Sequence, residues 1–267
     1  TYAGFHAAAR CISGGPIYIT DTPGNHNINL IKQISAYSPK GYTVALRPSC
    51  IALPTDPFVA YNSNRLLKVG SFSGGCGGCS ILAIFNVSES QNSELLLIDD
   101  FPGILPEHDY IIRAHTSGDV TAITPGIGSL MPIILPQYGW ELFTAVPVVK
   151  IKPPESTGHF TFGVLGIISV MSGVSAIIQQ SVNTETAHIA VTVTLKALGT
   201  LGFYISDLAS RDISKFLVTI AGNVVPFHTV RKSPQSNTIL EIDLEAAWNE
   251  LNLSAGWSNE TLIGFHM

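Results

Sequence analysis

The stretch Gly14-Gly15-Pro16-Ile17-Tyr18-Ile19-Thr20-Asp21-Thr22-Pro23-Gly24-Asn25-His26 joins a short apolar run to a turn and places one carboxylate between them. Apolar runs of about four to eight residues, bounded by Gly and Pro, are typical of strands buried in a parallel sheet. Such strands end at the ligand-binding edge of barrels and doubly wound folds. Asp21, at the end of the predicted strand, is therefore a candidate catalytic residue.

Helices are predicted on both sides of this strand. Residues 2–12 contain strong helix formers and no breaker after Gly4, and Gly14-Gly15 follows as a stop. Downstream, Asn25 or Asn27 caps a helix whose apolar residues fall on one face and which ends near residues 38–41. The order helix, strand, loop, helix is that of one unit of a (β/α)8 barrel, seen with its preceding helix.

Several segments resemble one family, the raffinose synthase and alkaline α-galactosidase (seed imbibition protein-like) branch of glycoside hydrolase family 36. The first and most specific is Phe5-His6-Ala7-Ala8-Ala9-Arg10 followed by residues 14–26. Further matching segments extend to the end of the chain: Leu67-Lys68-Val69, Ile84-Phe85-Asn86, Tyr138-Gly139-Trp140-Glu141-Leu142-Phe143, Gly163-Val164-Leu165-Gly166, Ser172-Gly173, Gly202-Phe203-Tyr204-Ile205-Ser206-Asp207 and Ala255-Gly256-Trp257-Ser258-Asn259-Glu260. The resemblance covers nearly the whole chain, but only the first segment is specific to the chemistry.

The resemblance implies a retaining α-galactosyl enzyme in which Asp21 is the general acid/base. Arg10 and His26 are candidate substrate-binding residues, although Arg10, like His6, is open to facing either the barrel wall or the sugar. Such enzymes need two carboxyl groups about 5 Å apart, one to protonate the leaving oxygen and one to attack the anomeric carbon. The family's nucleophile is an Asp in a Lys-x-Asp setting on an earlier barrel strand, and no segment before Asp21 contains it. We therefore expect the chain to be a C-terminal fragment of a longer enzyme, inactive by itself.

Asp21 has a simpler interpretation as the N-cap of the following helix, in an Asp-Thr-Pro-Gly turn. His26 is likewise open to two roles, touching the substrate or capping that helix, with capping favoured. The acid role needs surroundings that favour the protonated carboxyl, which an apolar strand end and a neighbouring carboxylate both do. The residue types alone favour Asp21 as a helix cap, whereas the resemblance favours Asp21 as the general acid/base.

Composition restricts the class of protein. The chain has 267 residues, of which 46% are hydrophobic and only 12% charged, with a formal net charge of -5. This composition indicates a large buried core and no basic surface for phosphates, so nucleic acid is not an expected partner. A galactoside or galactinol-type sugar is the expected substrate, with no cofactor, and the oligomeric state stays open.

After about Gly41 the pattern changes to β. The predicted domains are residues 1–41, the end of the catalytic barrel; residues 42–64, a connecting segment with three prolines; and residues 65–267, an antiparallel β-sandwich with one helix near residues 244–251. The predicted strands of the sandwich are Leu66–Val69, Ser80–Val87, Glu94–Ile98, Tyr110–His115, Glu141–Val149, Phe160–Ile168, Val174–Ile178, His188–Leu195, Gly202–Ile205, Phe216–Ile220 and Thr238–Ile242. The predicted fold class is thus mostly β, with the last βα unit of a barrel before the sandwich.

Residues 162–178 are apolar apart from three serines and approach the length of a membrane span. Their glycines, their many Val and Ile residues and the turn at Met171-Ser172-Gly173 favour two strands instead. No membrane association is therefore expected, and the family's members suggest a cytoplasmic location.

No metal site is predicted. Cys76-Gly77-Gly78-Cys79 has the spacing of a half-site, but zinc needs a second pair, so a glycine-flanked loop, oxidised or not, is the preferred interpretation. His108 and His115 fit no metal spacing and are assigned structural roles. Asp99 and Asp100 are assigned to a turn, because neighbouring strand residues point to opposite faces and cannot act on one sugar.

Three functions follow from these observations. The main prediction is part of an α-galactosidase-like hydrolase acting on raffinose-type galactosides. The first alternative is galactosyl transfer from galactinol to sucrose, which uses the same carboxylates and differs only in whether a sugar or water attacks. The second alternative is a non-catalytic β-sandwich module that binds sugar or serves as an accessory domain.

Overall fold

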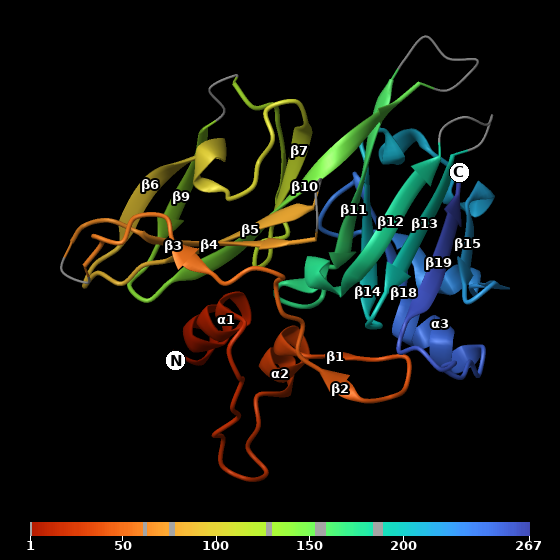
Figure 1. Ribbon diagram of the computed structural model, residues 1–267, viewed down its shortest axis with the longest axis horizontal. Coiled ribbons are helices and arrows are strands. Elements are labelled where there is room, and N and C mark those ends of the chain that lie inside the picture. Colours follow the sequence, from red (N-terminus) through yellow and green to blue (C-terminus); the bar gives the residue numbers. More distant parts are fainter. Residues whose placement is uncertain (1, 61–62, 75–77, 127–129, 153–158, 184–188) are drawn as a thin grey trace. The chain divides into compact units, whose positions relative to one another are not determined.

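The computed structural model describes residues 2–60, 63–74, 78–126, 130–152, 159–183 and 189–267 (Figure 1). Antiparallel strand pairs dominate these residues, which confirms the predicted mostly-β fold with its C-terminal β-sandwich. The chain divides into two compact units, Thr1–Ile34 with Ala45–Pro147 and Ser35–Val44 with Val148–Met267. The domain boundaries placed after residues 41 and 64 stay a prediction.

The described residues of the first unit form two sheets, two α-helices and one short 3-10 helix. Its larger sheet runs in the order β3, β4, β5, β10, β7, β8, and β6 pairs with β9 to form a second sheet. Strand β10 begins in this unit and ends in the other. The elements are α1 (Ala3–Ser13), α2 (Ile28–Ile34), β3 (Leu53–Pro54), β4 (Leu67–Ser73), β5 (Cys79–Phe85), β6 (Asn92–Leu97), η1 (Ile98–Asp100), β7 (Asp109–Ala114), β8 (Val120–Ile123), β9 (Leu130–Leu135) and β10 (Trp140–Ile151).

Buried apolar side chains from both sheets form one core in the first unit. The larger sheet contributes Leu82 and Ile84 from β5, and the register of the smaller sheet places Leu96 of β6 opposite Met131 of β9. Both of these pairs belong to the same cluster of buried side chains. The two sheets therefore pack face to face as a sandwich.

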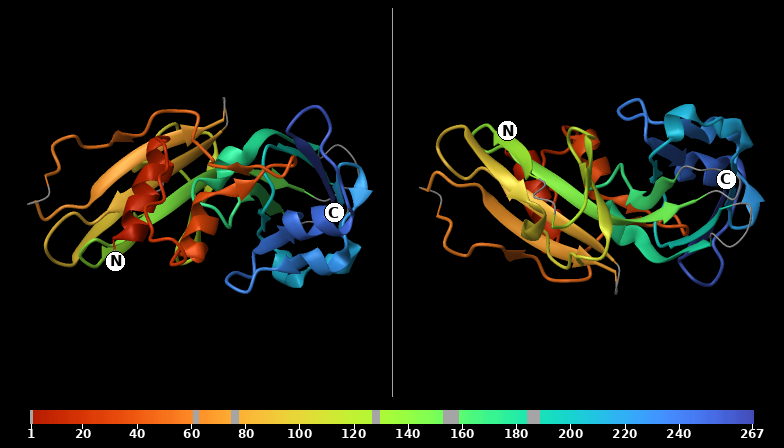
Figure 2. Two further views of the ribbon diagram at one scale, coloured as in Figure 1. Left: turned by 90° about the horizontal axis from the view of Figure 1, so that it is seen from below. Right: turned by 90° about the horizontal axis from the view of Figure 1, so that it is seen from above.

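Helix α1 covers the other face of β5. All seven residues of β5 are buried, and α1 turns Ala7, Ala8, Cys11 and Ile12 inward. The two rings of Phe5 and Phe85 lie edge to face with centroids 4.9 Å apart. Figure 2 shows α1 lying over the strands of the first unit. Helices α1 and α2 thus belong to the same compact unit as the strands between residues 45 and 147.

The second unit is a sandwich of two antiparallel sheets. One sheet runs in the order β17, β18, β14, β11 and the end of β10, and the other in the order β12, β13, β19, β15, β16. A separate hairpin pairs β1 with β2. The elements are β1 (Ala36–Tyr37), β2 (Thr43–Val44), β11 (Phe160–Ile167), η2 (Gly173–Ala176), β12 (Ile177–Asn183), β13 (Ala190–Leu195), β14 (Thr200–Ile205), η3 (Leu208–Ser210), η4 (Ile213–Lys215), β15 (Leu217–Ile220), β16 (Asn223–Val224), η5 (Phe227–Thr229), β17 (Val230–Lys232), β18 (Ile239–Asp243), α3 (Leu244–Glu250) and β19 (Thr261–His266).

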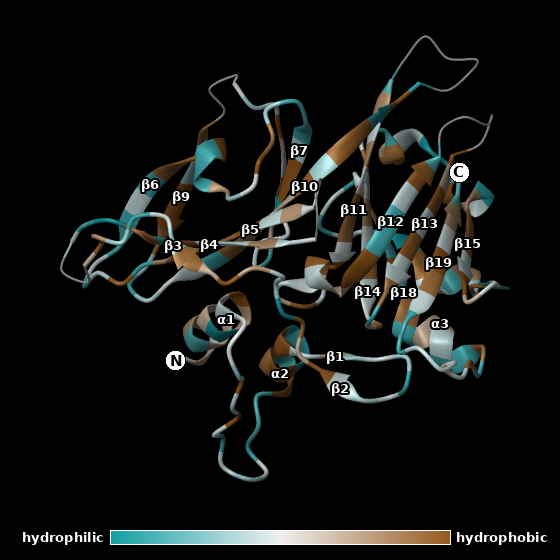
Figure 3. Ribbon diagram, in the orientation of Figure 1, coloured by the Kyte–Doolittle hydropathy of each residue, from teal (hydrophilic) through white to brown (hydrophobic). Residues whose placement is uncertain are grey.

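Three phenylalanine rings join the two sheets of the second unit. Phe162 of β11 and Phe203 of β14 belong to one sheet, and Phe265 of β19 belongs to the other. The centroid of Phe265 lies 4.9 Å from that of Phe203 and 6.0 Å from that of Phe162. In Figure 3 the strands of this unit carry most of its brown, hydrophobic residues. This core is what a sandwich of alternating strands requires.

The long apolar run forms two strands, as expected. Strand β11 ends at Ile167, a turn and the short helix η2 follow, and β12 begins at Ile177. The predicted strand at Val174–Ile178 therefore starts later than expected, because residues 173–176 are helical. No helix of the described residues is long and apolar enough to cross a membrane.

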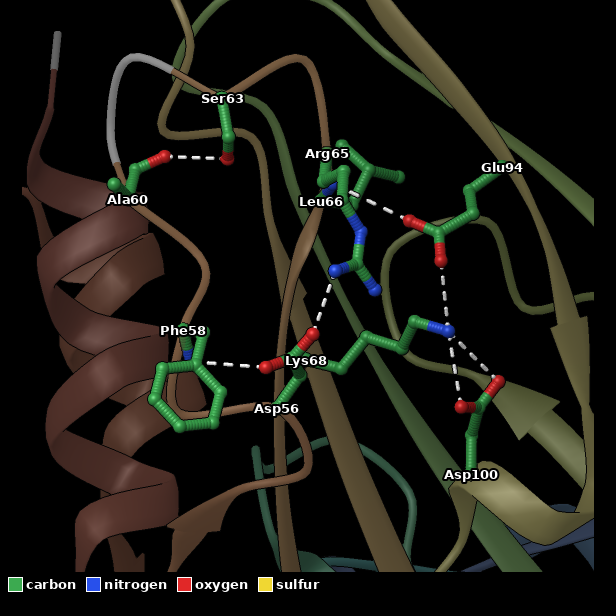
Figure 4. A network of polar contacts seen from close by, with 9 residues as sticks. All are labelled: Asp56, Phe58, Ala60, Ser63, Arg65, Leu66, Lys68, Glu94 and Asp100. Carbon is green, nitrogen blue, oxygen red and sulfur yellow. Dashed lines mark hydrogen bonds and ion pairs between the residues drawn. The ribbon is translucent and has the colours of Figure 1, made fainter.

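A charge network links three elements of the first unit (Figure 4). The ammonium nitrogen of Lys68 on β4 lies 2.8 Å from Glu94 Oε1 of β6 and 2.9 Å from Asp100 Oδ1 of η1. These three side chains are 12%, 24% and 16% exposed. Burial lowers the pKa of Lys68, but its hydrogen bonds and charge interactions with the two carboxylates outweigh burial and hold the pKa above its ordinary value. The network fastens the smaller sheet to β4.

Replacing Lys68 with methionine is expected to destabilise the first unit by about 3 kcal/mol, because two largely buried carboxylates lose their shared cation. Urea unfolding followed by circular dichroism measures this change. The variant that also carries Glu94→Gln and Asp100→Asn is the control, since it removes all three charges and is expected to recover more than half of the loss. Equal destabilisation of both variants would show that packing, and not charge, holds this position.

Candidate functional site

The loop between α1 and α2 carries Asp21, and its two ends are fixed as the sequence predicts. Helix α1 ends at Gly14, which takes the left-handed conformation with φ 68° that favours glycine. Helix α2 begins after Asn27, whose Oδ1 accepts a hydrogen bond from the Leu30 amide at 3.1 Å. The predicted end of α2 near residues 38–41 is wrong, because the helix ends at Ile34.

The predicted strand before Asp21 is not formed. Residues 15–20 have no regular secondary structure, and the side chains of Tyr18 and Ile19 are 77% and 52% exposed. A parallel strand needs hydrogen-bonded neighbours for its backbone groups, and no described strand pairs with this segment. The helix, strand, loop, helix order is therefore found as helix, loop, helix, and the expected apolar burial at Asp21 is absent.

Asp21 folds back onto the beginning of α2. Its Oδ2 accepts a hydrogen bond from the Asn27 amide at 3.3 Å and lies 3.7 Å from His26 Nδ1. A turn between them is closed by the Asn25 amide, which donates to the Thr22 carbonyl at 2.9 Å. Asp21 is therefore not the N-cap of α2, because Asn27 caps the helix and Asp21 accepts from the amide of Asn27 itself. The side chain of Asp21 stays 38% exposed. A group held by one oxygen and still open to solvent remains available to a ligand.

Asp21 and Arg10 line the same hollow, of about 460 Å³, between α1, the loop and α2. His26 touches Asp21 but does not line the hollow. The lining is apolar with a few polar groups, which is the usual character of a small-molecule site. Its described lining residues are Ala3, His6, Ala7, Arg10, Ile17, Tyr18, Ile19, Thr20, Asp21, Asn27, Leu30, Ile31 and Ile34. Asp21 is the single carboxylate in this set.

The other acidic residues singled out in the sequence lie elsewhere. Asp99 and Asp100 are part of η1, where Asp99 is exposed and Asp100 is paired with Lys68. Among the residues described, no group of three or more His, Cys, Asp or Glu side chains could hold a metal ion. Neither carboxylate therefore joins Asp21 at the hollow.

The cysteine pair at residues 76–79 lies partly outside the described residues, because Cys76 is not among them. Cys79 is buried at the start of β5, and burial raises the pKa of its thiol to about 12. Burial raises the pKa of Cys11 in α1 to about 12 as well. Thiols that stay protonated at neutral pH are poor nucleophiles and poor metal ligands, so both are core residues.

His115 and Gln33 are neighbours that the sequence does not connect. His115 follows β7, and its Nε2 lies 3.2 Å from Gln33 Oε1 of α2. The imidazole stacks on Trp140 with ring centroids 6.4 Å apart. Burial, and secondarily the positive charge of Arg113, lower the pKa of His115 from 6.5 to about 4. In the sequence, Gln33 is only a polar residue next to the apolar Ile34. That signal is too weak to predict its contact with His115.

The depressed pKa of His115 predicts a loss of stability in acid. The unfolded chain takes up a proton near pH 6.5 and the folded chain near pH 4, so unfolding becomes easier as the pH falls between these values. Because the ring is partly exposed, we expect about 1–2 kcal/mol, below the ~3 kcal/mol of the full shift. Urea midpoints at several pH values measure it. His115→Phe should remove this component, and an unchanged pH slope in that variant would contradict the assignment.

Comparison with known proteins finds a family that the first part of the chain resembles. Residues 1–90 match the family model described as raffinose synthase or seed imbibition protein Sip1. These matched residues include Arg10, Asp21 and His26. This match supports a similarity to the raffinose synthase branch of glycoside hydrolase family 36. The resemblance found in the sequence is thereby confirmed.

Several curated plant proteins are similar to this chain. It is 24% identical over 237 residues to the probable galactinol–sucrose galactosyltransferase 1 of Arabidopsis thaliana, covering 79% of this chain and 30% of that protein. It is 41% identical over 90 residues to the galactinol–sucrose galactosyltransferase of Pisum sativum, covering 32% of this chain and 10% of that protein. The chain thus spans at most about 30% of the length of these two relatives.

Proposed function

We propose that this chain forms part of an enzyme that transfers a galactosyl group from galactinol to sucrose, with Asp21 as general acid/base. The observation that carries the proposal is the family-model match over residues 1–90, which includes the Asp21 loop. The similar proteins are named for transfer from galactinol to sucrose, which favours transfer over the hydrolysis first predicted. Hydrolysis of raffinose-type galactosides differs from it only in using water as the acceptor.

The proposed reaction has two steps. In the first, the Asp21 carboxyl gives its proton to the oxygen that leaves galactinol as the bond to the anomeric carbon breaks, while a second carboxylate attacks that carbon and forms a covalent galactosyl-enzyme. In the second, the Asp21 carboxylate takes a proton from a sucrose hydroxyl, whose oxygen attacks the same carbon and displaces the second carboxylate. Both carboxylates return to their starting states.

The residues around Asp21 have supporting roles in this proposal. The Arg10 guanidinium supplies fixed donors for sugar hydroxyls, since it lines the hollow with Asp21. His26, 3.7 Å from Asp21, and the Asn27 amide hold the carboxylate in place. The second carboxylate is not among the described lining residues, so the 267-residue chain by itself is expected to be inactive.

The test is an assay of polypeptides that contain this sequence, given galactinol as donor with and without sucrose. Transfer predicts a trisaccharide and free inositol in equal amounts, with little free galactose. Free galactose without trisaccharide, from galactinol or from raffinose, would instead support the hydrolase. No turnover of galactinol, raffinose or melibiose by a polypeptide as long as the relatives would favour the non-catalytic module.

A further inference from the structure

Helix α2 sets the position of Asp21 but is too short to be stable alone. It has seven residues, and its first turn fixes Asp21 through the Asn27 amide and the Asn27 cap on Leu30. Helices shorter than about twelve residues are marginal in water without tertiary support. Only Ile34 of α2 is buried. The tertiary contacts that stabilise α2 therefore determine how firmly Asp21 is held in position.

Part of that support is packing against α1, and part is a chain of contacts that begins on β10. The backbone amide of His115 donates to the Leu142 carbonyl of β10 at 2.8 Å, and its ring stacks on Trp140 of the same strand. Trp140 in turn packs against α1, since a methyl group at Gly4 would lie 3.0 Å from the indole nitrogen. The imidazole is thus held in place by the sheet and presents Nε2 to Gln33.

The proton on this imidazole can be assigned from its partners. Gln33 Nε2 lies 3.3 Å from the Asn29 carbonyl oxygen, which can only accept, so the amide nitrogen of Gln33 faces that oxygen. Gln33 Oε1 then faces His115 and must receive a hydrogen from it. His115 therefore carries its proton on Nε2. Its low pKa keeps the ring neutral at neutral pH, in this single tautomer.

We propose that His115, by donating from Nε2 to Gln33, is a positioning residue that holds α2 and through it the Asp21 carboxylate. The inference rests on the proposed role of Asp21. Gln33 lies six residues after Asn27, the residue that caps α2, or about 9 Å along the helix axis, so His115 acts at a distance from the substrate. Displacement of a catalytic group by about 1 Å costs up to about a hundredfold in rate, so this anchor affects kcat more than KM.

The kinetic test uses a galactosyl-transferring polypeptide that contains this sequence. His115→Phe keeps the stacking on Trp140 but cannot donate, and it is expected to lower kcat for galactinol roughly tenfold or more with KM changed less than about twofold. His115→Gln restores a neutral donor and is expected to recover most of kcat. His108→Phe is the matched control, because His108 also lies edge to face with an aromatic ring, that of Tyr110, and stands before the start of β7 while His115 follows its end.

A double-variant comparison separates positioning from general stability. In an Asp21→Asn background, His115→Phe should lower the remaining rate less than twofold, because the group it positions is already gone. An equal loss in both backgrounds, or no rescue by His115→Gln, would overturn the positioning role. If Asp21→Asn itself has no effect, the proposed function fails first, and the two failures are therefore distinct.

Nuclear magnetic resonance tests the proton assignment without any activity. In the 267-residue chain labelled with nitrogen-15, the His115 ring is expected to show the neutral tautomer protonated on Nε2 at pH 7. Gln33→Leu should shift these ring signals toward a tautomer mixture. A ring protonated on Nδ1 at pH 7, or signals unmoved by Gln33→Leu, would contradict the hydrogen bond on which the inference depends.

Discussion

Replacing Asp21 with asparagine is expected to lower transfer from galactinol about 10³-fold in a polypeptide that transfers galactose, because general acid catalysis contributes about 10²–10⁴-fold. The leaving group of galactinol is an alcohol that cannot depart without a proton. Aryl galactosides with acidic leaving groups need no such proton, and the first step on them should be largely spared. The ratio of the two rates, measured for wild type and variant, reports the acid role directly.

The structure makes asparagine a suitable probe at this position. Asparagine keeps an oxygen that can accept from the Asn27 amide, so the loop and α2 should hold their places. Unfolding free energies of the variant and the wild type are therefore expected to agree within about 1 kcal/mol. Asp99→Asn is the matched control, since Asp99 is exposed on η1. An equal loss on both kinds of donor would contradict the acid role.

The ends of the site loop could be predicted from sequence, while the loop itself could not. Gly14 and Asn27 act through local backbone geometry, which their own residue types determine. The strand before Asp21 depends on neighbouring strands, and an apolar run such as Ile17-Tyr18-Ile19 cannot supply them. The contact between Gln33 and His115 joins residues 82 apart in the chain, and no local pattern predicts it.

The sandwich strands were predictable where apolar residues run or alternate without interruption. Strands β5, β7, β13 and β18 lie within a residue or two of their predicted bounds. Strands β9 and β19 were missed, because Pro132 and Gly264 interrupt them. Proline removes a backbone donor and is tolerated at sheet edges, and among the described strands β9 pairs only with β6. Glycine is tolerated in β19 because a side chain there would collide with Thr219 of β15.

Gly173→Ala is expected to destabilise the second unit by more than about 4 kcal/mol, which is at the extreme of single substitutions. A methyl group at Gly173 would overlap the carbonyl oxygen of Ile167, which is backbone and cannot rotate away. That carbonyl accepts from the Val170 amide within the turn after β11, and the Gly173 amide donates to the Val170 carbonyl. Relief of the clash would therefore break the turn that joins the two sheets through β11 and β12.

Gly256→Ala is the matched control for this prediction, since a methyl group there meets no atom within 4 Å and the residue lies in the same unit. It should leave stability unchanged or raise it slightly, because alanine restricts the unfolded chain. Urea midpoints for the two variants are expected to differ widely in the transition of the second unit, while the transition of the first unit stays fixed. A Gly173→Ala variant as stable as Gly256→Ala would mean that the turn after β11 does not approach η2 as closely as described. In that case the long apolar run at residues 162–178 would need a different connection between its two strands.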